Sequence, residues 1–343
     1  MKLGLQLGYW GSGPPTDVAA KVDEAERLGF DSVWTAEAYG SDALTPLAWL
    51  GPRTHRLRLG TALCQLSART PTAMAMAAMT MDHLSGGRFV LGLGVSGPQV
   101  VEGWYGQPFP RPLARTREYV SVVRKVLQRE APVRNDGPHY PLPLVRPEST
   151  GLGKPLKPIV HPLRSDLPII LGAEGSKNVA LTAEIADGWL PIFYAPAHDE
   201  AYRKALAEGF SRPEARRRPD DFEVIATATV MVSDDIEEAA DAIRPFLALY
   251  IGGMGAREVN FHFQVFARMG FEDAARRIQD LYLDGHKGEA AAAVPTALVE
   301  ATSLIGPREK IRDDLEAWKE SLVTTLLVGG GIEQMRLMAE LLG

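Results

Sequence analysis

The sequence predicts an α/β fold that closes into a (β/α)8 TIM barrel with insertions. Short apolar segments typical of buried strands alternate with longer segments typical of amphipathic helices, and such alternation predicts a parallel sheet. It occurs eight times within 343 residues. Closure at eight strands is the commonest outcome at this chain length.

The first half supplies four predicted strands and three predicted helices. Residues 3–8 are predicted to form a buried strand, residues 14–16 open a helix with one apolar face, and Gly29 ends that helix. Further strands are predicted at 31–35, 56–63 and 88–93, with helices at 72–84 and 113–129.

The second half continues the pattern. Strands are predicted at 167–171, 188–191, 222–232 and 324–328, and helices at 177–186, 200–208, 236–251, 256–283, 308–321 and 332–342. Residues 1–343 are thus expected to form one barrel domain with a proline-rich insertion at about 132–168. Its nine prolines and net charge of +2 fit a lid over an anionic ligand or a solvated surface excursion equally well.

Composition narrows the classes of function. A net charge of −6 argues against general nucleic-acid binding and gives no reason to expect an anionic membrane surface as partner. The single cysteine, Cys64, excludes an internal disulfide framework. The first residues do not resemble a signal peptide, and no apolar run reaches the ~20 residues that span a bilayer. A soluble, cytoplasmic protein acting on a small molecule is expected.

The glycine-rich segment after the predicted strand 88–93 has two interpretations. Gly92, Gly94 and Gly97 match G-x-G-x-x-G, the fingerprint of a Rossmann dinucleotide site. That site needs a helix directly after the loop and an acidic strand end about 20 residues on. Here the loop runs into 104–108, and the second position lies inside the predicted helix around Glu118. The Rossmann interpretation is therefore rejected in favour of a ligand loop at the carboxyl edge of a barrel.

Functional residues of a barrel lie where its strands end. Glu37 follows an apolar strand and could bind a ligand hydroxyl or shuttle a proton, although a salt-bridged loop carboxylate is the commoner case. Two predicted helix starts, at 175–176 and after 329–331, could each bind a phosphate. The first could equally be an ordinary serine cap and the second a plain turn. Cys64 is more typical of a buried filler than of a nucleophile.

The remaining chemistry is sparse. The seven histidines show no metal-ligand spacing, so no metal site is expected. No P-loop or G-x-S-x-G elbow is present. A large pocket with few acid–base groups suits an enzyme whose cofactor performs the difficult chemistry. Aromatic residues near the strand ends could line that pocket or pack in the core: Tyr9, Trp10, Trp104 and Tyr105.

Several segments together resemble the luciferase-like flavin and deazaflavin oxidoreductases, most closely their coenzyme F420-dependent branch. They are GFDSVWTAEAYGSDALTPLAWL, RLRLGTAL, LSGGRFVLGLGVSGPQVVEGWYG, RTREYV and KNVALTAEIADGWLP, which span nearly the whole chain. The resemblance implies a bacterial luciferase-like barrel, a homodimer, and a cis peptide bond between Ala62 and Leu63. It also implies a cofactor at the strand ends, against Gly8, Ala62, Leu63, Cys64, Val95, Ser96, Gly97, Ala173, Glu174, Gly175 and Ser176.

One departure from the resemblance bears on the reaction. Sugar-phosphate dehydrogenases and pterin reductases of this group carry Asp-His where this chain has Glu37-Ala38. Reduction of a C=C or C=N bond by reduced F420 is therefore predicted rather than alcohol oxidation, with Glu37, Tyr39 or water as the acid. The phosphate and oligoglutamate tail of F420 gives the basic insertion a role, through Lys154, Lys157, His161 and Arg164.

Two other functions stay open. An FMN-dependent monooxygenase would use the same fold with O2, and FMN lacks the long anionic tail. A cofactor-binding barrel without turnover would bind its ligand and transfer no hydride.

Overall fold

Eight parallel strands form a closed barrel in the computed structural model, which describes residues 1–147, 149–257 and 259–343. In order around the barrel they are β1 (Lys2–Gly8), β2 (Ser32–Thr35), β3 (Arg58–Thr61), β5 (Phe89–Gly94), β6 (Ile169–Leu171), β7 (Gly188–Trp189), β8 (Glu223–Val232) and β10 (Thr325–Val328). Pairing of β10 with both β1 and β8 closes the ring. All eight predicted strands and the (β/α)8 fold are confirmed.

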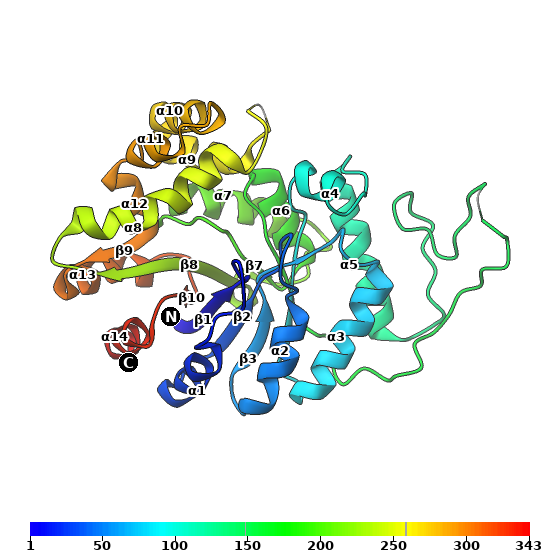
Figure 1. Ribbon diagram of the computed structural model, residues 1–343. Helices are drawn as coiled ribbons and strands as arrows, with labels where there is room; N and C mark the ends of the chain where they lie inside the picture. Colours follow the sequence, from blue (N-terminus) through cyan, green and yellow to red (C-terminus); the bar gives the residue numbers. More distant parts are fainter. Residues whose placement is uncertain (148, 258) are drawn as a thin grey trace.

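Helices surround the strands (Figure 1). They are α1 (Val18–Leu28), α2 (Leu44–Leu50), α3 (Pro71–Ser85), α5 (Pro112–Gln128), α6 (Ser176–Ile185), α7 (Asp199–Phe210), α13 (Arg308–Glu320) and α14 (Ile332–Leu342). Short 3-10 turns occupy Gly51–Arg53, Pro196–His198 and Pro219–Asp221. The first helix starts at Val18, later than the predicted 14–16, because Pro14 and Pro15 lie in an irregular stretch before it.

The region between β8 and β10 differs most from the prediction. It contains α8 (Ile236–Ala248), the π-turn η4 (Leu249–Gly253), α9 (Phe261–Phe266), the π-turn η5 (Ala267–Phe271), α10 (Glu272–Leu283), α11 (Lys287–Ala292), α12 (Thr296–Thr302) and β9 (Ser303–Gly306). The single helix predicted at 256–283 is wrong. Asn260 starts a new helix by accepting the N–H groups of His262 and Phe263, and Gly270 at φ +87 breaks the helical path.

This region has its own hydrophobic core. β8 is ten residues long, and its second half pairs with β9 instead of continuing around the barrel. Phe193, Ile251, Phe266 and Ile278 belong to a cluster separate from the one between the barrel strands and the outer helices. A second layer of structure is thus built beyond the carboxyl end of β8.

The barrel interior is filled by side chains. Trp34 is fully buried there, among Val90, Ile170, Ile225 and Leu327. A Cβ atom on the neighbouring Gly60 would lie 2.3 Å from the Trp34 ring, so glycine at that position makes room for the indole. The centre of the barrel is therefore closed, and the space for a ligand lies above it at the strand ends.

The proline-rich segment, residues 132–168, runs outside α3 and α5, away from the barrel axis (Figure 1). Its described residues form no helix and one isolated bridge, between Asn135 and Leu142. Arg164 donates to the carbonyl of Phe89, the first residue of β5, at 2.6 Å. The end of the segment therefore lies at the amino-terminal end of the barrel, opposite the strand ends where a lid would be needed.

Candidate active site

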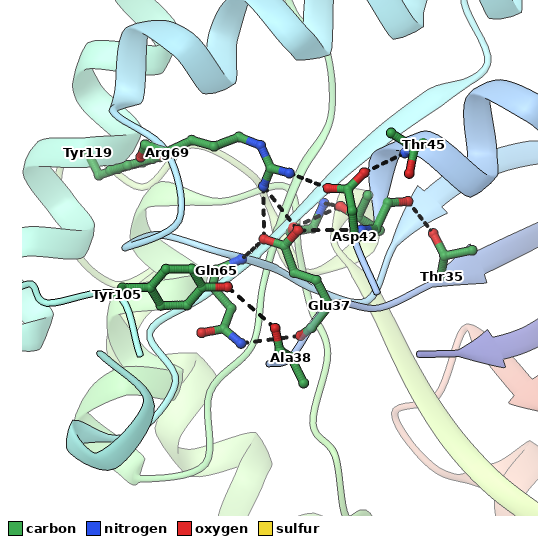
Figure 2. A network of polar contacts seen from close by, with 12 residues as sticks. Thr35, Glu37, Ala38, Asp42, Thr45, Gln65, Arg69, Tyr105 and Tyr119 are labelled. Atoms are coloured by element: carbon green, nitrogen blue, oxygen red, sulfur yellow. Dashed lines mark hydrogen bonds and ion pairs between the residues drawn. The ribbon is translucent and has the colours of Figure 1, made fainter. Parts of the chain in front are cut away.

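A polar network at the ends of β2 and β4 (Cys64–Gln65) centres on Glu37 (Figure 2). Arg69 Nη1 donates to both carboxylate oxygens, at 2.9 and 3.0 Å, and the backbone N–H of Gln65 donates to Oε1 at 2.8 Å. Arg69 Nη2 pairs with Asp42 as well. The side chain of Glu37 is only 4% exposed. Glu37 therefore ties two strand ends together as a salt-bridged loop carboxylate.

Two tyrosines lie near Glu37: Tyr39 follows it by two residues, and Tyr105 contacts the backbone of Ala38. Tyr39 is 58% exposed, so its hydroxyl is accessible at the edge. Tyr105 is half-buried and donates to the carbonyl of Ala38 at 3.5 Å, and burial together with Glu37 raises the pKa of its hydroxyl. Of the two side chains predicted as the acid, Glu37 and Tyr39, only Tyr39 is accessible.

Leu63 is held at the top of the barrel by glycines on the next two strands. The Ala62–Leu63 peptide bond is cis, as the resemblance implied. A Cβ atom on Gly94 would lie 2.7 Å from Leu63 Cδ1, and one on Gly172 would lie 2.2 Å from the same atom. Ala62 and Leu63 are half-buried and contact the barrel-interior cluster. Gly94 and Gly172 thus make room for the Leu63 side chain. The G-x-G-x-x-G pattern, which includes Gly94, did not reveal this packing role.

Cys64, the next residue, has a fully buried side chain, and burial together with Glu37 raises the pKa of its thiol. This burial fits the expected filler role of the side chain. The contact of Cys64 with the cofactor stays a prediction.

Val95, Ser96 and Gly97 form the loop after β5, all half-buried at the barrel edge. Ser96 adopts a left-handed conformation at φ +59. A short helix, α4 (Pro98–Gly103), follows directly and was not predicted. One of the two reasons for rejecting the Rossmann site is therefore wrong, whereas the closed parallel barrel excludes that site on its own.

The loop after β6 leads into α6 without a side-chain cap. Gly175 is exposed at the start of the helix, and no side chain in the described part of the chain binds the first-turn N–H groups of Ser176 and Lys177. At the alternative helix start, the N–H of Gly331 is bound by Gln334 Oε1 at 3.0 Å. Among the described residues, a side chain thus binds the cap-residue N–H at the start of α14 and none binds an N–H group at the start of α6.

Glu174 and Ala173 are turned toward the protein rather than toward that helix start. Ala173 accepts a hydrogen bond from Trp189 Nε1 at 2.8 Å, and Glu174 Oε1 accepts one from the N–H of Ile192 at 2.8 Å. Burial raises the pKa of Glu174 to about 8. Its carboxyl group braces the ends of β6 and β7 and is largely uncharged at neutral pH.

Three residues of the site were missed because they come from the region between β8 and β10. Arg268 Nη2 donates to the carbonyl of Glu174 at 2.9 Å, which brings a cation next to the start of α6. Burial raises the pKa of the Tyr250 hydroxyl, and the nearby hydroxyls of Tyr9 and Tyr39 raise it further. His262 packs edge-on against Tyr250, and burial lowers its pKa to about 3, so the imidazole is neutral. No sequence spacing links these residues to the strand ends.

The aromatic residues near the strand ends are mostly not core residues. Tyr9, Trp10 and Trp104 are all exposed. Trp10 also lines an apolar cavity of about 250 Å³ between β1, α1 and α2, together with Leu7, Pro14, Pro15, Val18, Thr35, Pro46 and Trp49. The edge of the barrel therefore presents aromatic surface.

The predicted contacts of the basic insertion with the cofactor are not supported. Lys157 Nζ donates to the carbonyl of Glu130 at 3.0 Å, beyond the last residue of α5, and Arg164 pairs with Asp82 at the end of α3. His161 accepts a hydrogen bond from His83, also at the end of α3, through its carbonyl. Lys154 is exposed on the same segment. The cause is the path of the segment, which the sequence does not specify.

Among residues 1–147, 149–257 and 259–343, no group of three or more His, Cys, Asp or Glu side chains is placed to hold a metal ion. Within the same ranges, no helix is long and apolar enough to cross a membrane.

Comparison with known proteins identifies relatives of the chain. The chain is 59% identical over 342 residues to Rv3520c of Mycobacterium tuberculosis, which is provisionally named a coenzyme F420-dependent oxidoreductase, with 99% of each chain covered. It is 27% identical over 317 residues to 5,10-methylenetetrahydromethanopterin reductase of Archaeoglobus fulgidus, covering 91% and 88% of the two chains.

Solved structures share the same fold. The F420-dependent tetrahydromethanopterin reductase of Methanopyrus kandleri superposes with a TM-score of 0.79 at 23% identity, covering 99% of this chain and 97% of that one. An F420-dependent secondary alcohol dehydrogenase gives 0.76 at 16% identity, with the same coverage. Residues 4–325 match the family described as luciferase-like monooxygenase, so the chain belongs to the luciferase-like monooxygenase family.

Proposed function

We propose that this chain is a coenzyme F420-dependent oxidoreductase that reduces a C=C or C=N bond of a small, uncharged organic substrate. The main observation behind this proposal is the composition of one barrel edge. It combines the apolar side chain of Leu63, exposed aromatic rings and the start of α6, which lies beside Arg268. The name of the Mycobacterium relative, at 59% identity over nearly the whole chain, supports the same cofactor.

The residues at this edge fit a deazaflavin with a phosphate. Gly8 takes a positive φ of +66, and a Cβ atom there, or on Gly175, would meet no atom within 4 Å, so both positions border open space. Ala62, Leu63 and the 95–97 loop would contact the ring. The N–H groups at the start of α6, with Lys177 and Arg268, would bind the phosphate. Gln65 Oε1 is buried without a partner among the described residues and would accept a ligand hydrogen bond.

The protein's own groups would then position and protonate the substrate. When bound, reduced F420 would supply the hydride. Each oxygen of Glu37 already accepts hydrogen bonds, so we assign Glu37 to holding the strand ends that carry Leu63 and Gln65. Tyr39, exposed at the same edge, would donate the proton that completes the reduction, directly or through water. Tyr250 and the neutral imidazole of His262 would form an uncharged wall on the substrate side.

An anaerobic titration of the purified protein with F420 and, separately, with FMN tests the cofactor. Following cofactor fluorescence, we expect tighter binding of F420. Lys177→Glu should weaken F420 binding by about 10-fold, since it reverses a charge in the first turn of α6. Lys157→Glu is the matched control, at the far end of the barrel, and should leave the affinity unchanged.

Three outcomes would change the proposal. Preference for FMN would move the chain to the monooxygenase alternative. F420 binding without hydride transfer to any enone or imine tested would favour a barrel without turnover. Equal loss of affinity in both lysine variants would remove α6 as the phosphate site.

A further inference from the structure

The apolar cavity that Trp10 helps to line lies outside the barrel wall, between β1, α1 and α2. It measures about 250 Å³, whereas protein interiors contain few voids larger than a water molecule. Leu7, which lines it from β1, packs with the cluster between the strands and the outer helices. The cavity is therefore separate from the barrel interior, which the indole of Trp34 fills.

The chemistry of the cavity wall is almost entirely apolar. None of the described residues that line the cavity carries a charge. Thr35 lines it as well, but its hydroxyl already donates to the carbonyl of Ala43 at 2.6 Å. A charged or strongly polar group brought into this space would give up water for few new partners. The wall therefore selects for apolar groups.

The segments around the cavity are held in place by their own contacts. Arg53, just after α2, pairs with Asp23 of α1 through two hydrogen bonds, at 2.6 and 3.1 Å. The backbone N–H of Trp10 donates to Ser41 Oγ at 2.9 Å, which joins the loops after β1 and β2. Three of the lining residues are prolines, whose backbone is restricted. A cavity formed in advance in this way loses little entropy when a ligand binds.

The cavity has a solvent-facing side and a buried side. Trp10 and Trp49 are 37% and 63% exposed, whereas Thr35 and Pro46 are buried. Two indole rings thus lie where the lining meets solvent. Concave sites lined by apolar and aromatic side chains are typical of small-molecule binding.

We propose that this cavity is a ligand site apart from the active site, which binds a neutral hydrocarbon group of bicyclic size. An apolar cavity of roughly 150 Å³ is enough to bind benzene, so 250 Å³ suits a ring system of about ten carbon atoms. Leu7 directly precedes Gly8, which borders open space at the barrel edge, so an occupant would contact the segment next to that edge. The proposal does not rest on the proposed function.

Fluorine NMR of the purified protein without coenzyme tests the site, with 2-fluoronaphthalene as the probe. We expect saturable broadening of the probe signal. The charged analogue 6-fluoro-2-naphthoate should bind at least 10-fold more weakly, because its carboxylate would lose water. Val18→Trp occupies part of the cavity from α1 and should weaken binding of the probe by about 10-fold or more.

The matched control is Val232→Trp, at an exposed position at the end of β8, which should bind the probe as the wild type does. Circular dichroism melts show whether both variants fold. Absence of saturable binding, equal binding of the naphthoate, or equal affinity of folded Val18→Trp and wild type would overturn the proposal.

A second measurement locates the probe even if Val18→Trp does not fold. Cys64 is buried, so a nitroxide label can be attached to a single introduced cysteine. A label on Thr45→Cys, next to the lining residue Pro46, should broaden the bound probe more than a label on Lys177→Cys at the start of α6. The reverse order would overturn the proposal and assign the probe to the active-site edge.

Discussion

Removal of Arg69 should destabilise the protein through Glu37. In Arg69→Met the side chain keeps a similar length, but Glu37 and Asp42 lose their shared cation. Breaking a buried ion pair from one side costs about 3–5 kcal/mol. The Arg69 side chain is 25% exposed, so solvent screens part of this, and about 3 kcal/mol is expected.

The corresponding shift in melting temperature follows from chain length. Unfolding entropy of ~2.1 cal/mol/K per residue gives roughly 0.7 kcal/mol/K for 343 residues, so the midpoint should fall by about 4 °C. Differential scanning calorimetry measures it. Arg276→Met, which removes an exposed pair with Glu272, is the control and should leave the midpoint unchanged.

A second variant, Glu37→Gln, separates the two roles considered for Glu37, positioning of the strand ends and proton donation. If Glu37 positions the strand ends, Glu37→Gln should lower both the melting midpoint and F420 affinity. A proton donor would instead lose turnover at unchanged stability and affinity. An Arg69→Met midpoint within about 1 °C of wild type would refute the reasoning, because the network would then contribute little to the edge.

Three further predictions concern the strand ends. The pKa of Glu174 is 4.5 in the unfolded chain and about 8 in the folded protein, so the folded protein binds the proton more tightly. The free energy of unfolding of the wild type should therefore fall by up to ~4 kcal/mol relative to Glu174→Gln as the pH rises from 4.5 to 8. Urea unfolding at both pH values measures this, and a constant difference between the two proteins would contradict it. Gly172→Ala should cost about 1–3 kcal/mol by pressing on Leu63, and Leu63→Ala in the same chain should recover part of that loss in a double-mutant cycle; simple additivity would count against the contact. Ser96 has a left-handed backbone, so Ser96→Val should lower the free energy of unfolding by about 1–2 kcal/mol whereas Ser96→Gly should not. Equal melting midpoints of the two variants would contradict this.

The sequence predicts the barrel well because each strand is a short buried run with its own local signal. Leu3, Leu5 and Val33 are buried where the pattern required it. The region after β8 is harder, since the amphipathic period continues across Gly270 and hides the break between η5 and α10. The four-residue strand β9 is also too short to stand out from the helices around it.

The site is predicted only as far as strand ends define it. Positions such as Glu37 follow from the rule that barrel chemistry lies at the carboxyl edge. Their partners do not: Arg69 lies 32 residues from Glu37, and Arg268 lies 94 residues from Glu174. Pairings over such separations depend on tertiary structure, which also decides that the end of the proline-rich segment, at Arg164, lies at the amino-terminal end of the barrel.

The separate core beyond β8 has a consequence for how members of such a fold can diverge. Tyr250 and His262 belong to that core, whereas Leu63 and the start of α6 belong to the barrel. Because the two are packed independently, substitutions or insertions between β8 and β10 that keep Arg268, which contacts the carbonyl of Glu174, can reshape what enters the site without repacking the barrel part that would bind the coenzyme. Evolution can therefore change the substrate of such a protein while the redox chemistry is preserved. Grafting the region between β8 and β10 from one relative onto another should transfer the substrate preference of the donor.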